Sequence, residues 1–177
     1  MEAFGITTVG FLFYMKEIEM ALTLPKVDET FEVALRIDSA LDMTVEEYNE
    51  YLKTCDKSLL TTVEGETPTF IVMRKVLPHS LAQKVENAQL AFKDGELHPQ
   101  KGFIIEHVRC CIVGINNPPG LPKDQCIEYK KAPDGGCSDE LISQLQSADL
   151  INDLYTAHSN ACRSGSNALT KKKLKPS

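Results

Sequence analysis

The chain has 177 residues, of which 42% are apolar and 25% are charged, with a formal net charge of −6. This balance is typical of one globular domain with or without tails, and it excludes wholesale disorder. Aromatic residues make up only 7% and tryptophan is absent, which argues against a stacking platform for single-stranded nucleic acid.

The first segment, residues 1–29, is expected to be an arm outside the domain. Residues 3–15 are largely apolar, but Glu2 precedes them, so the basic start of a signal peptide is missing. Lys16 and Glu17 can be encoded by AAG-GAG, a bacterial ribosome-binding sequence, just upstream of Met20. This suggests the hypothesis that translation begins at Met20 and that residues 1–19 are not translated.

The next predicted elements are a strand, a helix and a second strand. Residues 31–37 alternate apolar and mixed positions and indicate a short strand or extended arm. Thr44 and Glu47 form a capping box that opens a helix running to about residue 53. Residues 69–77, rich in β-branched side chains and bounded by prolines, give the clearest strand prediction.

Three further helices are predicted in the second half. Ser80 caps a helix to about residue 92, and residues 101–115 carry an apolar stripe at three- and four-residue steps. Residues 116–120 (Asn-Asn-Pro-Pro-Gly) stop that helix, and Ser138 caps a last long one. The chain is therefore predicted to be a helix-rich α+β domain over residues 30–160, with a short antiparallel β element and flexible tails at both ends.

The last segment, residues 161–177, is predicted to be a disordered basic tail. Residues 163–177 carry a local charge of +5, which leaves −11 on the rest of the chain. An acidic body repels nucleic-acid phosphates and anionic membranes, so neither is an expected partner. No apolar run reaches the length needed to span a bilayer.

Six cysteines raise the question of disulfides or a metal site. The missing secretion signal favours reduced thiols in a cytoplasmic protein, and Cys111 is expected in the core. A zinc site can be drawn from four positions, but its spacing matches no known zinc module: His107, Cys110 or Cys111, Cys126 and Cys137. We therefore expect no metal.

No catalytic constellation emerges either. His107 and Cys110 could form a nucleophile pair, but helical geometry disfavours it, and Glu106 with Arg109 fits an ion pair three residues apart. His158 is expected to follow the last helix and to favour its negative end. The chain is therefore expected not to be an enzyme and to bind no cofactor.

The order and spacing of several runs resemble small proteins encoded among the structural genes of tailed bacteriophages. The runs are residues 40–51, 68–70 with Arg74, 106–109 through 114–116, and 141–154, so the resemblance covers about residues 30–160. It implies a protein like the tail assembly chaperones, which bind the tape-measure protein while tail-tube subunits polymerise. Genes of tail assembly chaperones commonly carry a programmed ribosomal frameshift near their end. The lysines at 171–173 fit this subgroup, because they can be encoded by AAA-AAA-AAG, a slippery sequence on which such a frameshift can occur.

On this interpretation the partners are phage structural proteins, met in the cytoplasm of the bacterial host or in the virion. Apolar stripes of the helical body would hold helices of the tape-measure protein or of tail-tube subunits. The expected contact face, exposed or half-exposed, is Tyr48, Tyr51, Phe92 and Tyr155. The alternative for these four is ordinary core packing, which is favoured for Tyr48. Two alternatives stay open: a virion component such as a head–tail connector or minor tail protein, and a small host-targeting inhibitor. Whether the chain forms a homo-oligomer also stays open.

Overall fold

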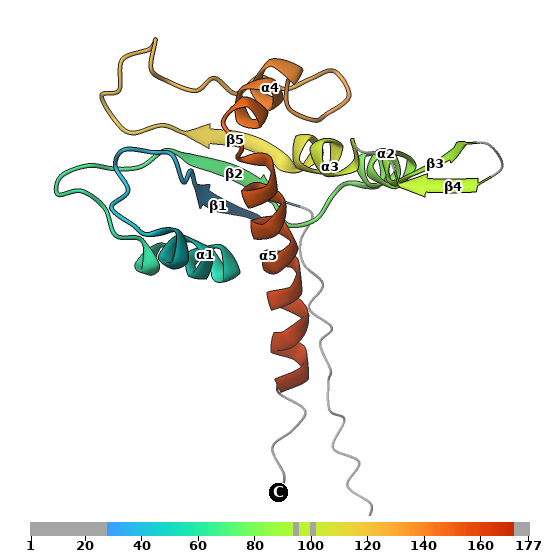
Figure 1. The fold of residues 1–177 in the computed structure, drawn as a ribbon, viewed down its shortest axis with the longest axis horizontal. Coiled ribbons are helices and arrows are strands. Elements are labelled where there is room, and N and C mark those ends of the chain that lie inside the picture. Colours follow the sequence, from blue (N-terminus) through green and yellow to red (C-terminus); the bar gives the residue numbers. More distant parts are fainter. Residues whose placement is uncertain (1–27, 94–95, 100–101, 172–177) are drawn as a thin grey trace, which may run out of the picture.

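The computed structural model describes residues 28–93, 96–99 and 102–171, and Figure 1 draws the others as a thin grey trace. The elements confirm an α+β protein rich in helix, with antiparallel strands. In chain order they are β1 (Thr30–Ala34), α1 (Val45–Thr54), a 3-10 turn η1 (Lys57–Leu59), β2 (Phe70–Arg74), α2 (His79–Gln89), β3 (Leu90–Lys93), β4 (Glu96–Pro99), α3 (Phe103–Cys111), β5 (Ile112–Asn116), α4 (Asp139–Ser147) and α5 (Ile151–Lys171).

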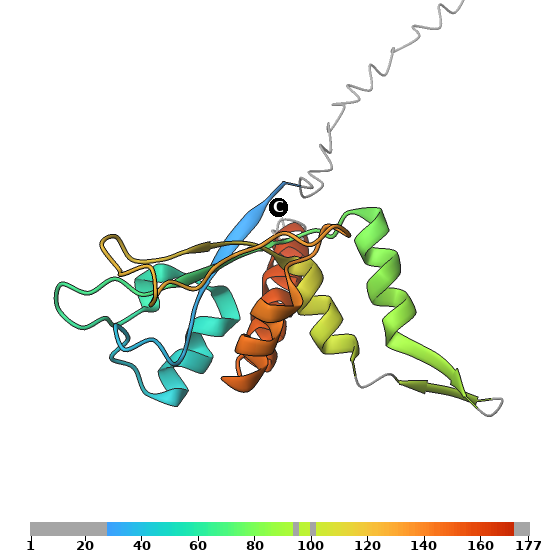
Figure 2. The same ribbon diagram turned by 90° about the horizontal axis from the view of Figure 1, so that it is seen from above.

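A three-stranded antiparallel sheet forms the centre of the fold. Its strand order is β1-β2-β5, so β2 pairs with both neighbours. The register between β2 and β5 shifts between Val72 and Met73, where Met73 pairs with Ile112. Such a bulge bends a strand and increases its twist. The second sheet is the β3–β4 hairpin, which extends from the end of α2 away from the central sheet (Figures 1 and 2).

The core lies between the central sheet and the helices on one side of it. Figure 2 shows α1, α3 and α5 on the same side of the sheet. Ile71 and Met73 of β2 and Ile112 of β5 are fully buried, and Leu141 of α4 and Leu154 of α5 belong to the same cluster. Burying each of these side chains contributes roughly 1.5–3 kcal/mol of hydrophobic stabilisation.

Helix α1 begins as predicted, and its side chains bond the free edge of β1, one of the two edge strands of the sheet. The Thr44 hydroxyl accepts from the Glu47 amide at 3.3 Å, and the Glu47 carboxylate accepts from the Thr44 amide at 2.8 Å, which completes the capping box. On the buried face of α1, the Tyr48 hydroxyl donates to the Ala34 carbonyl at 2.8 Å, and the Tyr51 hydroxyl accepts from the Ala34 amide at 2.9 Å. Backbone groups of an edge strand have no neighbouring strand to bond, so these two hydroxyls satisfy them instead.

Two of the predicted helices end early and continue as strands. The helix expected over 101–115 stops at Cys111, and residues 112–116 form β5 because they pair with β2. The helix expected to reach residue 92 stops at Gln89, and Leu90–Lys93 pairs with Glu96–Pro99. In both places the apolar residues fit either periodicity, and strand pairing decided between them: β5 pairs with the distant β2, and β3 pairs with β4, the next strand in sequence.

The last predicted helix is two helices. Ser138 caps α4 as expected, with its hydroxyl accepting from the Leu141 amide at 3.4 Å. The chain then turns at Asp149, whose φ of 56° is left-handed, before α5 begins at Ile151. The turn lets the two helices contact each other, so their apolar faces share the core cluster.

Helix α5 extends into the segment predicted to be a disordered tail. Helix α5 continues to Lys171, past the boundary expected at residue 160, since no proline interrupts the chain before Pro176. The expected arm at 1–29 and the lysines beyond 171 lie almost entirely outside the described residues. Within the described part of the chain, no helix combines the length and hydrophobicity that a bilayer crossing requires.

Candidate functional site

Two histidine–cysteine pairs face each other where α3 packs against α5. His107 and Cys111 are four residues apart on α3, and His158 and Cys162 are four residues apart on α5. Residues four apart lie on the same face of a helix, one turn above the other. Because the two helices are in contact, His107, Cys111 and His158 meet in the space between them, and Cys162 lies beside the His158 ring.

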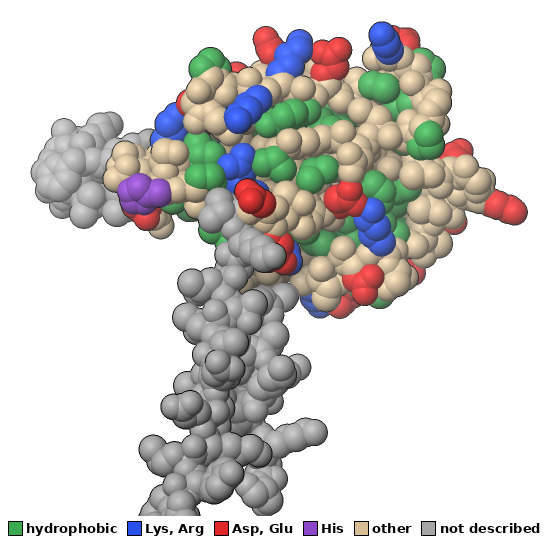
Figure 3. Space-filling model, turned by 180° about the vertical axis from the view of Figure 1, so that it is seen from behind, with side chains coloured by type: hydrophobic (Ala, Val, Ile, Leu, Met, Phe, Trp, Pro, Cys, Tyr) green, Lys and Arg blue, Asp and Glu red, His purple; other side chains and the backbone are tan. Residues whose placement is uncertain are grey.

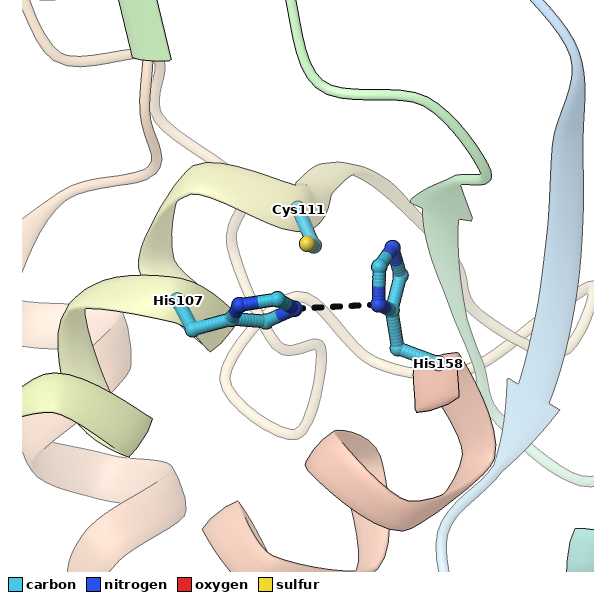
Figure 4. A group of neighbouring side chains, drawn as sticks. All are labelled: His107, Cys111 and His158. Carbon is cyan, nitrogen blue, oxygen red and sulfur yellow. Dashed lines mark hydrogen bonds between the residues drawn. The ribbon is translucent and has the colours of Figure 1, made fainter. Parts of the chain in front are cut away.

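Three of these side chains, His107, Cys111 and His158, place their ligand atoms close to one another. His107 Nε2 is 3.0 Å from His158 Nδ1, and Figure 4 marks this interaction with a dashed line. These nitrogens and the Cys111 sulfur form a group whose ligand atoms lie within 4.8 Å of one another. The Cys162 sulfur lies 3.8 Å from His158 Nδ1 and 3.7 Å from its Nε2. It also donates to the Lys75 carbonyl at 3.3 Å.

Aromatic side chains hold both rings in place. The Phe103 and Tyr155 rings contact the His107 ring edge-on, with centroids 5.9 and 5.1 Å from it. The centroids of the Phe31 and His158 rings are 6.2 Å apart. The exposed fraction of His158 is only 6%. Edge-on aromatic contacts fix ring orientation as well as burying area. The site therefore has walls on several sides and is open on the side of the exposed Cys162.

Burial keeps both imidazoles neutral. Burial, with a smaller contribution from the neighbouring His158, lowers the pKa of His107 to about 4. Burial also lowers the pKa of His158, although a hydrogen bond with the Arg74 backbone acts in the opposite direction. At neutral pH each ring therefore has one protonated and one unprotonated nitrogen, and the unprotonated nitrogen can bind a metal ion.

The thiols in this region are poor nucleophiles. Burial raises the pKa of both Cys111 and Cys162, so neither is a thiolate at neutral pH without a further positive charge. Cys110, which the sequence paired with His107 as a possible nucleophile, is fully buried and donates to the Glu106 carboxylate at 3.6 Å. Its pKa is raised to about 11, chiefly by burial. The arrangement favours binding of a soft metal ion over nucleophilic catalysis.

One polar atom of the site lacks a protein partner. His107 Nδ1 is buried and has no hydrogen-bond partner among the described residues. If His107 Nε2 carries the proton and donates to His158 Nδ1, the orphan Nδ1 is an acceptor. A buried unpaired atom costs free energy, so the placement of the His107 ring carries a local penalty.

The zinc set considered from the sequence does not assemble. Its His107 and Cys111 join His158, but Cys126 donates to the Leu121 carbonyl at 3.6 Å and Cys137 is buried in the core cluster. The expectation that His158 follows the last helix is wrong, because α5 continues past it and buries its ring. Cys111 is buried as predicted, and no disulfide joins the six cysteines, all of which lie in the described part of the chain.

A second polar cluster surrounds Arg109. The predicted ion pair with Glu106 is confirmed, with Arg109 Nε 3.0 Å from the carboxylate. Arg109 also pairs with Asp134 and donates to the Cys137 carbonyl at 3.2 Å, and Asp134 accepts from Lys84 at 2.9 Å. These contacts tie the loop before α4 to α2 and α3. The guanidinium is already engaged on both sides by carboxylates, which is typical of a structural network.

The four predicted contact residues do not form one face. Core packing, the alternative favoured for Tyr48, holds for Tyr48 and also for Tyr51. Their exposed fractions are 3% and 0%, because their hydroxyls bond the edge of β1 and their rings pack in the core. Phe92 lies on β3, and its side chain is outside the described part of the structure. Tyr155 is half-buried beside His107.

His158 and Cys162 are the residues that sequence reasoning missed. The available signal was the same spacing used twice, His107-x-x-x-Cys111 and His158-x-x-x-Cys162, each able to place two ligands on one helix face. Comparison with models of protein families, with curated proteins and with solved structures finds no match to this chain.

Proposed function

We propose that the protein is a non-enzymatic phage assembly protein, a tail assembly chaperone that binds the tape-measure protein during tail morphogenesis. The observation that carries its binding role is an apolar edge of four large exposed side chains near α1. We define the apolar edge as Ile37, Val45, Leu59 and Val63, whose exposed fractions run from 40 to 59%.

These four residues come from two segments that hydrogen bonds hold side by side. The amide of Val63 donates to the Ala40 carbonyl at 2.9 Å, and the amide of Asp42 donates to the Thr61 carbonyl at 2.9 Å. Leu41 and Thr62 form an antiparallel bridge between the same segments. The apolar edge therefore sits on an ordered part of the fold, which lowers the entropy lost on binding a partner.

The charge around the apolar edge indicates what kind of partner fits. Residues 37–66 carry eight acidic and two basic side chains, a net charge of −6 that equals the net charge of the whole chain. A helix with an apolar stripe flanked by Lys or Arg would complement this surface. Figure 3 shows, on the face seen from behind, hydrophobic side chains reaching the surface between charged ones.

The chemistry of the cysteines supports binding over catalysis. Burial raises the pKa of Cys55 to about 11 and also raises that of Cys111, so these thiols stay protonated at neutral pH. A partner-binding surface needs no activated side chain.

A co-purification experiment tests the proposed partner. The full chain is co-expressed with overlapping segments of a tape-measure protein from the same phage, and captured complexes are quantified. We expect at least one helical segment to co-purify, and Ile37→Asp and Val63→Asp to reduce capture at least about tenfold, since each places a charge in an apolar contact. Gln146→Asp adds the same charge on the exposed surface of α4 and should not change capture.

Mass spectrometry of purified phage particles separates the alternatives. A chaperone should be absent from the particle, whereas a connector or minor tail protein should be present in a symmetric copy number. Capture of host proteins alone, with no tape-measure segment bound, would favour the host-targeting inhibitor and contradict the proposal.

A further inference from the structure

We propose that His107, Cys111, His158 and Cys162 form a zinc site that joins α3 to α5. The two nitrogens and two sulfurs come from two helices packed against each other, one histidine–cysteine pair from each helix. This inference is independent of the proposed assembly role, because none of the four residues belongs to the apolar edge.

The distances fit a tetrahedral ion. With Zn–N of about 2.0–2.1 Å and Zn–S of about 2.3 Å, tetrahedral geometry places two ligand nitrogens about 3.3 Å apart, and a nitrogen and a sulfur about 3.6 Å apart. The His107 and His158 nitrogens are 3.0 Å apart, and the Cys162 sulfur is 3.8 Å from His158 Nδ1. The Cys111 sulfur lies inside the same 4.8 Å group as the two histidines, whereas the Cys162 sulfur lies outside it and has to turn from the Lys75 carbonyl toward the centre to become the fourth ligand.

The ligand types select the metal. Thiolate and imidazole are soft and borderline ligands that suit Zn²⁺, whereas Ca²⁺ and Mg²⁺ require oxygen ligands. Two thiolates also cancel the charge of a divalent ion, so the loaded site is neutral in its partly buried place. Four protein ligands leave no open position, which is typical of a structural zinc site.

Binding is coupled to proton release. One Zn²⁺ replaces the protons on the Cys111 and Cys162 thiols and forms two Zn–S bonds, while two protons pass to the buffer. Each imidazole coordinates through one unprotonated nitrogen, with a change of tautomer at most. His158 keeps its hydrogen bond to the Arg74 backbone, and such contacts orient a ligating ring.

The role of the ion would be to fasten two distant parts of the chain. The two histidines are 51 positions apart in sequence, and α3 and α5 are separated by β5, the following loop and α4. Zinc binding therefore stabilises the folded state over the unfolded one by mass action.

A cobalt titration of the full chain tests the site. The reduced protein, freed of metal with a chelator, is titrated with Co²⁺ and then Zn²⁺ while visible and near-ultraviolet absorption is recorded. We expect one equivalent of Co²⁺ to give the bands of a tetrahedral thiolate complex, one equivalent of Zn²⁺ to remove them, and Zn²⁺ to raise the melting temperature.

Adjacent cysteines provide a matched control. Cys110 and Cys111 are both fully buried, so Cys110→Ser and Cys111→Ser carry similar folding penalties, but only Cys111 faces the histidines. Cys111→Ser should weaken Co²⁺ binding by more than the roughly 10–100-fold lost when a residue that only orients a ligand is changed. Cys110→Ser should bind as the wild type does.

Cys162→Ser tests the fourth ligand without disturbing the core, because Cys162 is exposed. It should also weaken binding and remove part of the sulfur-to-cobalt absorption. The proposal is overturned if the wild type gives no thiolate–cobalt complex at one equivalent, if Cys110→Ser loses binding as much as Cys111→Ser, or if Cys162→Ser binds unchanged.

Discussion

At the scale of single residues, two tyrosine hydroxyls replace a missing neighbour strand. Tyr48 and Tyr51 bond both the carbonyl and the amide of Ala34 on the free edge of β1, and Tyr51 also lies 3.4 Å from the Glu32 carbonyl. The burial of these hydroxyls raises the pKa of Tyr48 and of Tyr51, so both stay protonated at neutral pH. Their role is therefore to fix β1 against α1.

Removing either hydroxyl tests that role. Tyr48→Phe leaves the Ala34 carbonyl without this donor, and Tyr51→Phe leaves the Ala34 amide without this acceptor. Each should lower the free energy of unfolding by about 1–3 kcal/mol, the cost of a buried unpaired group. Urea denaturation followed by circular dichroism measures the change. Unaltered midpoints for both variants would mean that water reaches this edge and satisfies it.

At the scale of the elements, a single left-handed residue separates α4 from α5. Asp149 has a φ of 56° and an exposed side chain that lies 3.9 Å from Arg36. A left-handed conformation costs a residue with a Cβ roughly 1–2 kcal/mol, and Asp tolerates it better than most. The sequence offers no glycine or proline here, which is why the periodicity of 138–160 predicts one helix.

Substitutions at position 149 measure this strain. Asp149→Val should be less stable than Asp149→Gly by about 1–2 kcal/mol or more, because a β-branched side chain fits the left-handed region worst. Comparing the two variants with each other removes the contribution of the Arg36 ion pair, which both lack. Thermal unfolding of both proteins provides the comparison, and equal stabilities would show that the turn adapts to the new residue.

At the scale of the whole molecule, Asp134 connects parts that are distant in sequence. It accepts hydrogen bonds from Arg109 of α3, from Lys84 of α2 at 2.9 Å and from the Gly136 amide at 3.1 Å. The Arg109 and Lys84 contacts hold the pKa of the Asp134 carboxyl well below its usual range. The folded state therefore binds the Asp134 proton less readily than the unfolded state does.

This shift predicts an acid-dependent loss of stability. The contribution of Asp134 is fully present above the unfolded pKa of about 3.9 and is lost as the pH falls below it. Asp134→Asn should therefore be less stable than the wild type at pH 7, and the difference should shrink between about pH 5 and pH 2. Urea midpoints across this range test it, with Asp124→Asn as a control carboxylate in an exposed loop. A constant difference at all pH values would contradict the assignment.

Short-range patterns in the sequence determined much of the secondary structure. The Thr44 capping box, the Ser138 cap, the β-branched run of β2 and the Asn-Asn-Pro-Pro-Gly stop each act within a few residues, so each is visible without the fold. The same locality made the Glu106–Arg109 ion pair predictable, because residues three apart meet on any helix.

Only the tertiary structure decided which of two local solutions the chain adopts and which residues meet. Residues 112–116 fit a helix or a strand equally well until β2 pairs with them. From the sequence alone Tyr48 and Tyr51 are candidates for a contact surface, but packing against β1 buries both side chains. His107 and His158 come within 3.0 Å because α3 packs on α5. A local pattern fixes the face on which a side chain lies, whereas the partner of that face is set by long-range packing, which no short window of sequence contains.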